Sequence, residues 1–73
     1  MKLYYVSITI GKYDTLGEWA TSAKRVGNQL VIQRAGGGTR IFPIEKVLEW
    51  GTRNVTPDEA AKMAQITGKS YEA

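Results

Sequence analysis

The sequence predicts a small, mainly β domain: an antiparallel sheet of four to five strands, curled or SH3-like, followed by a short C-terminal helix or flexible tail. Residues 19–44 carry the clearest evidence, because glycine-bearing turns at 27–28 and 36–38 divide them into three segments rich in β-branched and apolar residues. The length of 73 residues allows one small domain. We therefore expect a β domain over residues 1–54 and a helical or disordered tail over residues 55–73.

The first strand is predicted over residues 3–10, where side chains alternate between two faces. The face that we expect to form the core is apolar throughout: Tyr4, Val6, Ile8 and Ile10. The opposite face begins with Leu3 and Tyr5 before it becomes polar. This pattern predicts an exposed outer face that is partly apolar.

The next residues, 11–18, contain turn-forming aspartate and glycine and are predicted as a loop. Within it, Tyr13 either folds back onto the sheet or is exposed as a contact residue. A second strand is expected over residues 19–26, and because neither of its faces is cleanly apolar, it is either an edge strand or a strongly curved one. Lys24 and Arg25 would protect such an edge from unwanted pairing.

Two further strands are predicted over residues 29–35 and 39–43, the first centred on an apolar triplet and the second ending at a proline that cannot donate to a ladder. Residues 43–46 are expected to form a single 3₁₀-like turn. A short strand over 47–50 would then close the sheet against the first strand, although a two-turn helix over the same residues remains open. In either case Trp50 is the best candidate to fill the core.

A helix is predicted to begin at Thr56, because a threonine, a proline and two acids in a row are typical of a capped helix start. Gly68 is expected to end it. The apolar side of this helix is narrow, so it would be marginal in isolation and either packs weakly on the sheet or orders on a partner. Residues 69–73 are expected to fray.

The composition argues against enzymatic chemistry. The chain contains no histidine and no cysteine, which removes the commonest general base, the commonest metal ligand and any thiolate site. The glycines at 36–38 lack the spacing of a phosphate-binding loop, and we interpret them as a hairpin turn. No apolar run is long enough to span a membrane. We expect a cytoplasmic, non-enzymatic protein with no cofactor and no metal.

The best strand-forming segment is also the most basic, since no acid lies between Glu18 and Glu45. With a net charge of +3, the chain would tolerate a polyanionic partner. Beside exposed aromatic rings, the basic residues would resemble the phosphate-binding and stacking surface of a small β-barrel nucleic-acid module. The simpler interpretation is a solvated outer face.

A protein-binding hypothesis depends on an open sheet edge, a partly apolar outer face and a poorly buried helix, all of which suit docking onto a larger partner. Aromatic residues and arginine dominate the energetics of such interfaces. The candidate partner-binding residues for both hypotheses are Leu3, Tyr5, Tyr13, Trp19, Lys24, Arg25, Arg34 and Arg40.

The whole chain, as a type, resembles the small compact proteins with which bacteriophages redirect host machinery. The resemblance is carried by the start M-K-L-Y-Y-V-S-I, the hairpin R-V-G-N-Q-L-V-I-Q-R, the segment I-F-P-I-E-K-V-L-E-W and the tail T-P-D-E-A-A-K-M. In size and character the chain is similar to small phage regulators of host RNA polymerase, such as that of a Xanthomonas phage.

This resemblance implies a non-enzymatic regulator that binds bacterial RNA polymerase in the host cytoplasm and inhibits initiation or permits antitermination. We expect the protein to be a monomer. It assigns no role to individual residues. A phage inhibitor of another host defence complex is the same kind of protein. An independent nucleic-acid-binding module is the alternative, with the basic sheet as its binding surface.

Overall fold

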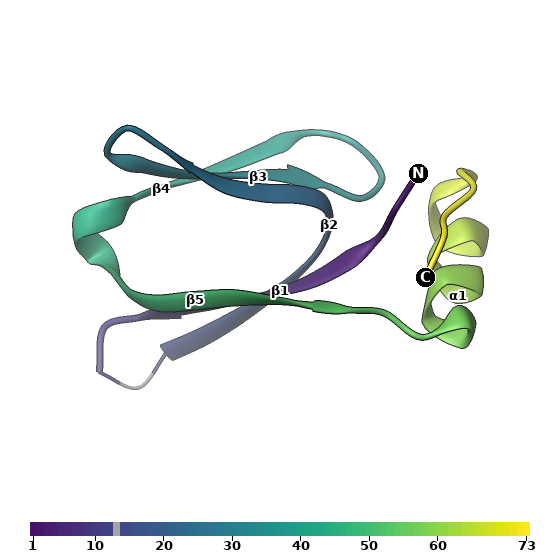
Figure 1. The fold of residues 1–73 in the computed structure, drawn as a ribbon, viewed down its shortest axis with the longest axis horizontal. Helices are drawn as coiled ribbons and strands as arrows, with labels where there is room; N and C mark the ends of the chain where they lie inside the picture. The colour runs from purple at the N-terminus through teal and green to yellow at the C-terminus, as the bar shows by residue number, and fades with distance from the viewer. Residues whose placement is uncertain (13) are drawn as a thin grey trace.

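The computed structural model describes residues 1–12 and 14–73. The described chain forms five strands, one 3₁₀ turn and one α-helix (Figure 1), which confirms the predicted fold class. The elements follow one another in the order β1 (Tyr4–Ile10), β2 (Asp14–Val26), β3 (Gln29–Arg34), β4 (Thr39–Pro43), η1 (Ile44–Lys46), β5 (Val47–Asn54) and α1 (Pro57–Thr67). All five strands belong to one antiparallel sheet with the order β4-β3-β2-β1-β5.

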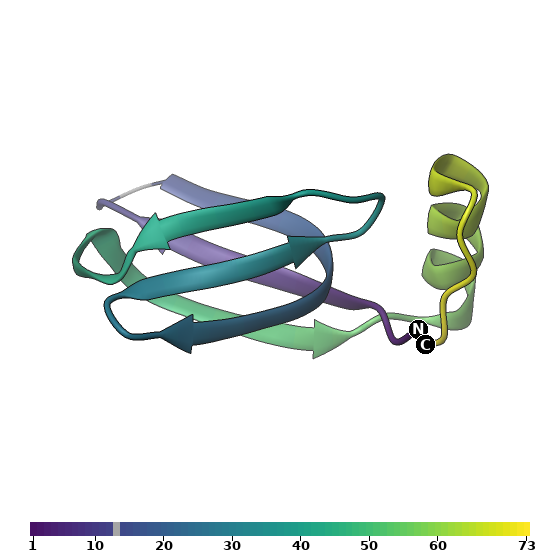
Figure 2. The same cartoon turned by 90° about the horizontal axis from the view of Figure 1, so that it is seen from above.

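The sheet curls without closing, so that β3 and β4 face β1 and β5 across its interior (Figures 1 and 2). The curl depends on β2, which has 13 residues and changes partner along its length. Its first part, up to Ala20, pairs with β1, and its second part pairs with β3 after a register shift between Ala20 and Ser22. The strand is therefore curved, as predicted, and it lies in the middle of the strand order and not at an edge.

The prediction of a loop over residues 11–18 is wrong for its second half, because β2 begins at Asp14. The turn-forming glycine that suggested a loop, Gly17, has a different role: a Cβ atom at this position would overlap the hydroxyl of Tyr5. Glycine at this position therefore leaves room for the Tyr5 ring across the sheet and does not mark a turn. Tyr13 lies outside the described residues.

The main core fills the interior of the curl. Val6 and Ile8 are fully buried there, as the alternation in the first strand predicted. Trp50 packs against this core and is partly buried, which agrees with its expected role. The buried residues of this cluster are Val6, Ile8, Ala20, Leu30, Ile32 and Phe42. Their burial is the main source of stability for a sheet of this size.

A second, smaller core lies between the end of the sheet and α1, which stands at one end of the molecule (Figures 1 and 2). Its buried residues are Leu3, Ala35, Val55 and Ala60. Leu3 has no exposed surface, so the expectation that it belongs to an exposed outer face is wrong. The reason is that the helix covers the start of β1, a contact between residues far apart in the sequence.

The turn and strand predicted after β4 are confirmed, and the open helical alternative is not observed. η1 forms a single 3₁₀ turn, and seven of the eight residues of β5 then pair antiparallel with β1, as far as Asn54. One register shift falls between Thr9 and Ile10, opposite the start of β5. The strand is longer than predicted because residues beyond the glycine at 51 continue the same ladder.

The helix begins and ends where its caps predicted. Thr56 forms a reciprocal capping box with Glu59, and Gly68 ends the helix in the left-handed conformation at φ 73°. The tail that follows is not frayed, contrary to expectation. The main chain of Glu72 donates to the carbonyl of Met1 at 2.8 Å and accepts from the N–H of Leu3 at 3.1 Å. These hydrogen bonds hold both ends of the chain beside α1.

Candidate interaction surface

The β5 edge, the side of β5 that faces away from β1, is one of the two outer edges of the described sheet. Among the described strands, β5 pairs only with β1, and its sequence contains neither lysine nor proline. The opposite edge strand, β4, has five residues and ends in Pro43. Proline, lysine and short length are common means of preventing unwanted strand pairing. β5 is thus the less protected of the two edges.

The backbone groups that line this edge can be identified from the register. The N–H of Ala35 donates to the carbonyl of Trp19 at 2.8 Å, so the peptide groups of Trp19 face away from β1. In an antiparallel sheet, the direction of the backbone N–H and C=O groups alternates from one residue to the next along a strand and from one strand to the next across the sheet. Arg53 lies in the same cross-strand row as Trp19, because both are paired with Tyr5 of β1. Arg53 therefore bonds to β1, whereas Trp50 and Thr52 direct their N–H and C=O groups outward.

The outer face beside this edge is hollowed where β1 and β5 carry the small residues Ser7 and Gly51 opposite each other, whereas the Tyr5 side chain fills the space over Gly17 in the same cross-strand row. Gly17 of β2, Ser7 of β1 and Gly51 of β5 lie opposite one another. A depression of about 350 Å³ lies over part of this row, and its lining includes Glu49 and Arg53. Two opposite charges thus flank Gly51 on the outer face of the edge strand.

Arg53 joins the edge strand to the helix. Its Nη1 and Nη2 atoms each donate to a carboxylate oxygen of Glu59 at 3.0 Å. The guanidinium lies over the Tyr5 ring, 4.8 Å from its centroid, and 5.9 Å from that of Trp19. The two rings meet edge to face at 4.8 Å. The structure therefore brings Tyr5 and Trp19 together, but around an arginine of their own chain.

This arrangement changes the acidity of Glu59. The hydrogen bond from Arg53, followed by that from the Thr56 backbone, lowers the pKa of the Glu59 carboxyl to about 2. The same hydrogen bond raises the pKa of Arg53. Both groups therefore carry full charge at neutral pH, and the start of α1 is held beside β5 by an ion pair as well as by packing.

Two of the predicted phosphate-binding residues are engaged with a buried acid. Glu18 is only 8% exposed, and its carboxylate lies 2.6 Å from Nη1 of Arg40 and 3.4 Å from Nε of Arg34. Arg40 also lies over the ring of Phe42 at 4.9 Å. Buried carboxylates need such compensation. These arginines neutralise Glu18, which reduces the positive charge that they offer to a phosphate.

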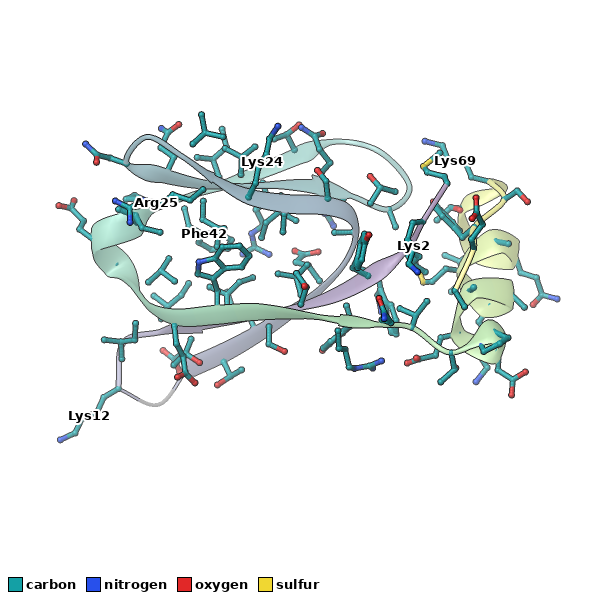
Figure 3. All side chains as sticks on the ribbon, in the orientation of Figure 1. Lys2, Lys12, Lys24, Arg25, Phe42 and Lys69 are labelled. Atoms are coloured by element: carbon teal, nitrogen blue, oxygen red, sulfur yellow. The ribbon has the colours of Figure 1, made fainter. Side chains whose placement is uncertain are left out.

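The other two predicted basic residues lie elsewhere. Lys24 and Arg25 are consecutive in β2, so their side chains leave opposite faces of the sheet, and their charged ends are well separated in Figure 3. Arg25 donates through Nε to the carbonyl of Gly27 at 3.0 Å. The four basic residues thus do not gather into a single surface.

Sequence reasoning missed the residues that shape this surface: Glu49, Gly51, Thr52 and Arg53. The signal for them was weak, because a strand was expected to end near Trp50. Glu18 was noticed only as the boundary of a segment without acids. Its role as the partner of two arginines depends on the cross-strand registers, which pairwise sequence patterns do not reveal.

In the described part of the chain, no group of three or more acidic, histidine or cysteine side chains is placed to hold a metal ion. No described helix is both long and apolar enough to cross a membrane. No protein-family model, no curated protein and no solved structure matches this sequence.

Proposed function

We propose that this protein is a non-enzymatic binding module that attaches to a larger protein by strand addition at the β5 edge. The observation that supports this proposal is an eight-residue edge strand without lysine or proline, whose Trp50 and Thr52 backbone groups point outward. An extended segment of a partner gains main-chain hydrogen bonds at such an edge, and pockets beside it supply specificity.

The larger protein that we propose is bacterial RNA polymerase, and the expected effect is inhibition of initiation or antitermination. The support for this partner is the resemblance of the chain to small phage regulators. Binding to a protein is favoured over binding to nucleic acid because Arg34 and Arg40 are paired with Glu18, while Lys24 and Arg25 point to opposite faces.

The test compares two substitutions at one position. Thr52→Pro removes an outward N–H, which an edge strand tolerates, whereas Thr52→Ala keeps it. With purified bacterial RNA polymerase as the probe in surface plasmon resonance, we expect the alanine variant to bind as the original protein does. We expect the proline variant to lose about tenfold or more in affinity, since a buried partner group would be left unpaired.

Circular dichroism of both variants shows whether the sheet is intact, so that loss of binding is not mistaken for loss of folding. Equal binding by a folded Thr52→Pro protein would refute strand addition at this edge. Absence of polymerase binding by the original chain would refute the proposed partner. Binding to free DNA or RNA that weakens steeply with salt would instead support the nucleic-acid module.

A further inference from the structure

The β5 edge is complementary to itself. Its outer face carries Glu49 and Arg53, placed symmetrically on either side of Gly51 in the segment Glu-Trp-Gly-Thr-Arg. If a second copy of β5 lies antiparallel to the first with the two Gly51 residues opposite each other, each Glu49 faces the Arg53 of the other copy. Opposite charges directly across an antiparallel pair are stabilising.

The backbone agrees with this register. Gly51 directs its hydrogen-bonding groups toward β1, so two opposed Gly51 residues would form a non-hydrogen-bonded pair, in which the chains approach most closely. Trp50 of one copy would then oppose Thr52 of the other, and both present outward N–H and C=O groups. Hydrogen-bonded pairs therefore fall on either side of the symmetry axis, as an antiparallel ladder requires.

Neighbouring registers are less suitable. A symmetry axis at Thr52 places Arg53 opposite Gly51, and one at Trp50 places Glu49 opposite Gly51, so both registers lose the two charge pairs.

Arg53 can bind a further carboxylate, because its hydrogen bonds to Asn54 and Glu59 use Nη1 and Nη2 and leave the Nε–H as a donor.

We propose that this protein forms a symmetric dimer in which the β5 strands of two copies pair antiparallel about Gly51 and join their sheets into one. The interface is isologous, so association closes at two copies. The outer edge, β4, is short and ends in Pro43, which opposes further growth of the sheet. This inference revises the expectation of a monomer.

The dimer uses the same edge as the proposed strand addition but does not depend on it. If both occur, they exclude each other, because one edge accepts one strand. Partner binding would then require the dimer to separate, and the active form would decrease as the concentration of the protein increases. Self-association would act as an inhibitor of the binding function.

Sedimentation velocity over a range of protein concentrations tests the dimer without any partner. We expect the original chain and Thr52→Ala to dimerise, and Thr52→Pro to remain monomeric. Glu49→Lys should weaken the dimer by about tenfold or more, because two attractive cross-strand contacts become repulsive. High salt should recover part of this loss, which a merely unfolded variant would not show.

Glu49 is exposed, so its substitution leaves the cores intact, and circular dichroism confirms this. A chain that stays monomeric up to millimolar concentration would overturn the dimer and leave strand addition to RNA polymerase to be judged by its own assay. A Glu49→Lys protein that dimerises as tightly as the original would overturn the register about Gly51. Conversely, a protein that dimerises at high concentration but does not bind polymerase at concentrations where it is monomeric would refute only the proposed function.

Discussion

Glu18 illustrates how a single residue determines the role of the residues around it. In the sequence, Arg34 and Arg40 look like free positive charges on a basic meander. In the structure both converge on one carboxylate that is 8% exposed. A buried charge must be compensated, so the arginines serve the stability of the fold before they serve any ligand.

The first prediction concerns the ion pair between Arg40 and Glu18. Arg40→Ala removes the closer partner of Glu18 and leaves only Arg34 at 3.4 Å. We expect the free energy of unfolding, measured by urea denaturation, to fall by about 2 kcal/mol, since a nearly buried carboxylate loses a charged hydrogen bond.

The matched control is Arg40→Ala combined with Glu18→Gln, which should recover part of the lost stability because the uncompensated charge is gone. Two results would show that Glu18 does not need Arg40. One is a single variant with the same free energy of unfolding as the original chain, and the other is a double variant that is less stable than the single variant.

At the scale of elements, α1 is attached to the sheet by a small apolar cluster and by the Arg53–Glu59 pair. Only Ala60 among the helix residues is buried, so the packing is modest, as the narrow apolar side predicted. The ion pair fixes the orientation of the helix relative to β5, because Glu59 also belongs to the capping box at the start of the helix. The start of the helix and the end of β5 are thus positioned by one carboxylate.

The second prediction is a pH dependence of stability. The pKa of Glu59 is lowered from 4.5 to about 2, so its contribution is present above 4.5 and disappears as the pH falls toward 2. The folded state binds this proton less readily than the unfolded state, and acidification therefore favours unfolding. Thermal melting at a series of pH values measures the effect.

Glu59→Gln keeps a side-chain oxygen for the capping box but removes the titrating group. We expect its melting temperature to decline less steeply than that of the original chain between pH 4.5 and about 2. Since other carboxylates titrate in the same range, only the difference between the two proteins is informative. Parallel curves would show that the Arg53–Glu59 pair makes no contribution.

At the scale of the whole molecule, the two ends of the chain complete the structure beside α1. Glu72 bonds to the backbone of Met1 and Leu3, and Tyr71 accepts a hydrogen bond from the N–H of Gly36 at 3.1 Å. These contacts link the tail to β1 and to the turn between β3 and β4. The helix and the tail thereby cover Leu3, which would otherwise be exposed.

The third prediction follows from this closure. In hydrogen exchange measured by NMR, the amides of Leu3 and Glu72 should be protected, because each donates to a backbone carbonyl of the other terminal segment. Tyr71→Phe should increase the exchange of both, since it removes the acceptor for Gly36. Exchange of Leu3 and Glu72 at the rate of an unfolded peptide would show that the tail is frayed after all.

Much of the fold was accessible from local patterns. The glycine turns, the alternation in β1 and the caps at Thr56 and Gly68 each depend on a few neighbouring residues, and these parts were predicted correctly. The candidate site was much less accessible. Of the eight predicted contact residues, Leu3 is buried and Tyr13 lies outside the described residues, while Tyr5 and Trp19 contact Arg53, an arginine that was not among them.

By itself, the sequence determined the fold class, the order of the elements and the lack of imidazole and thiol chemistry, since these follow from composition and from interactions a few residues long. Only the tertiary structure decided that β2 continues through Gly17, that Glu18 binds two arginines and that β5 presents an open edge. The physical reason is that these features arise from pairing between strands distant in the chain, where one register among several determines which side chains meet.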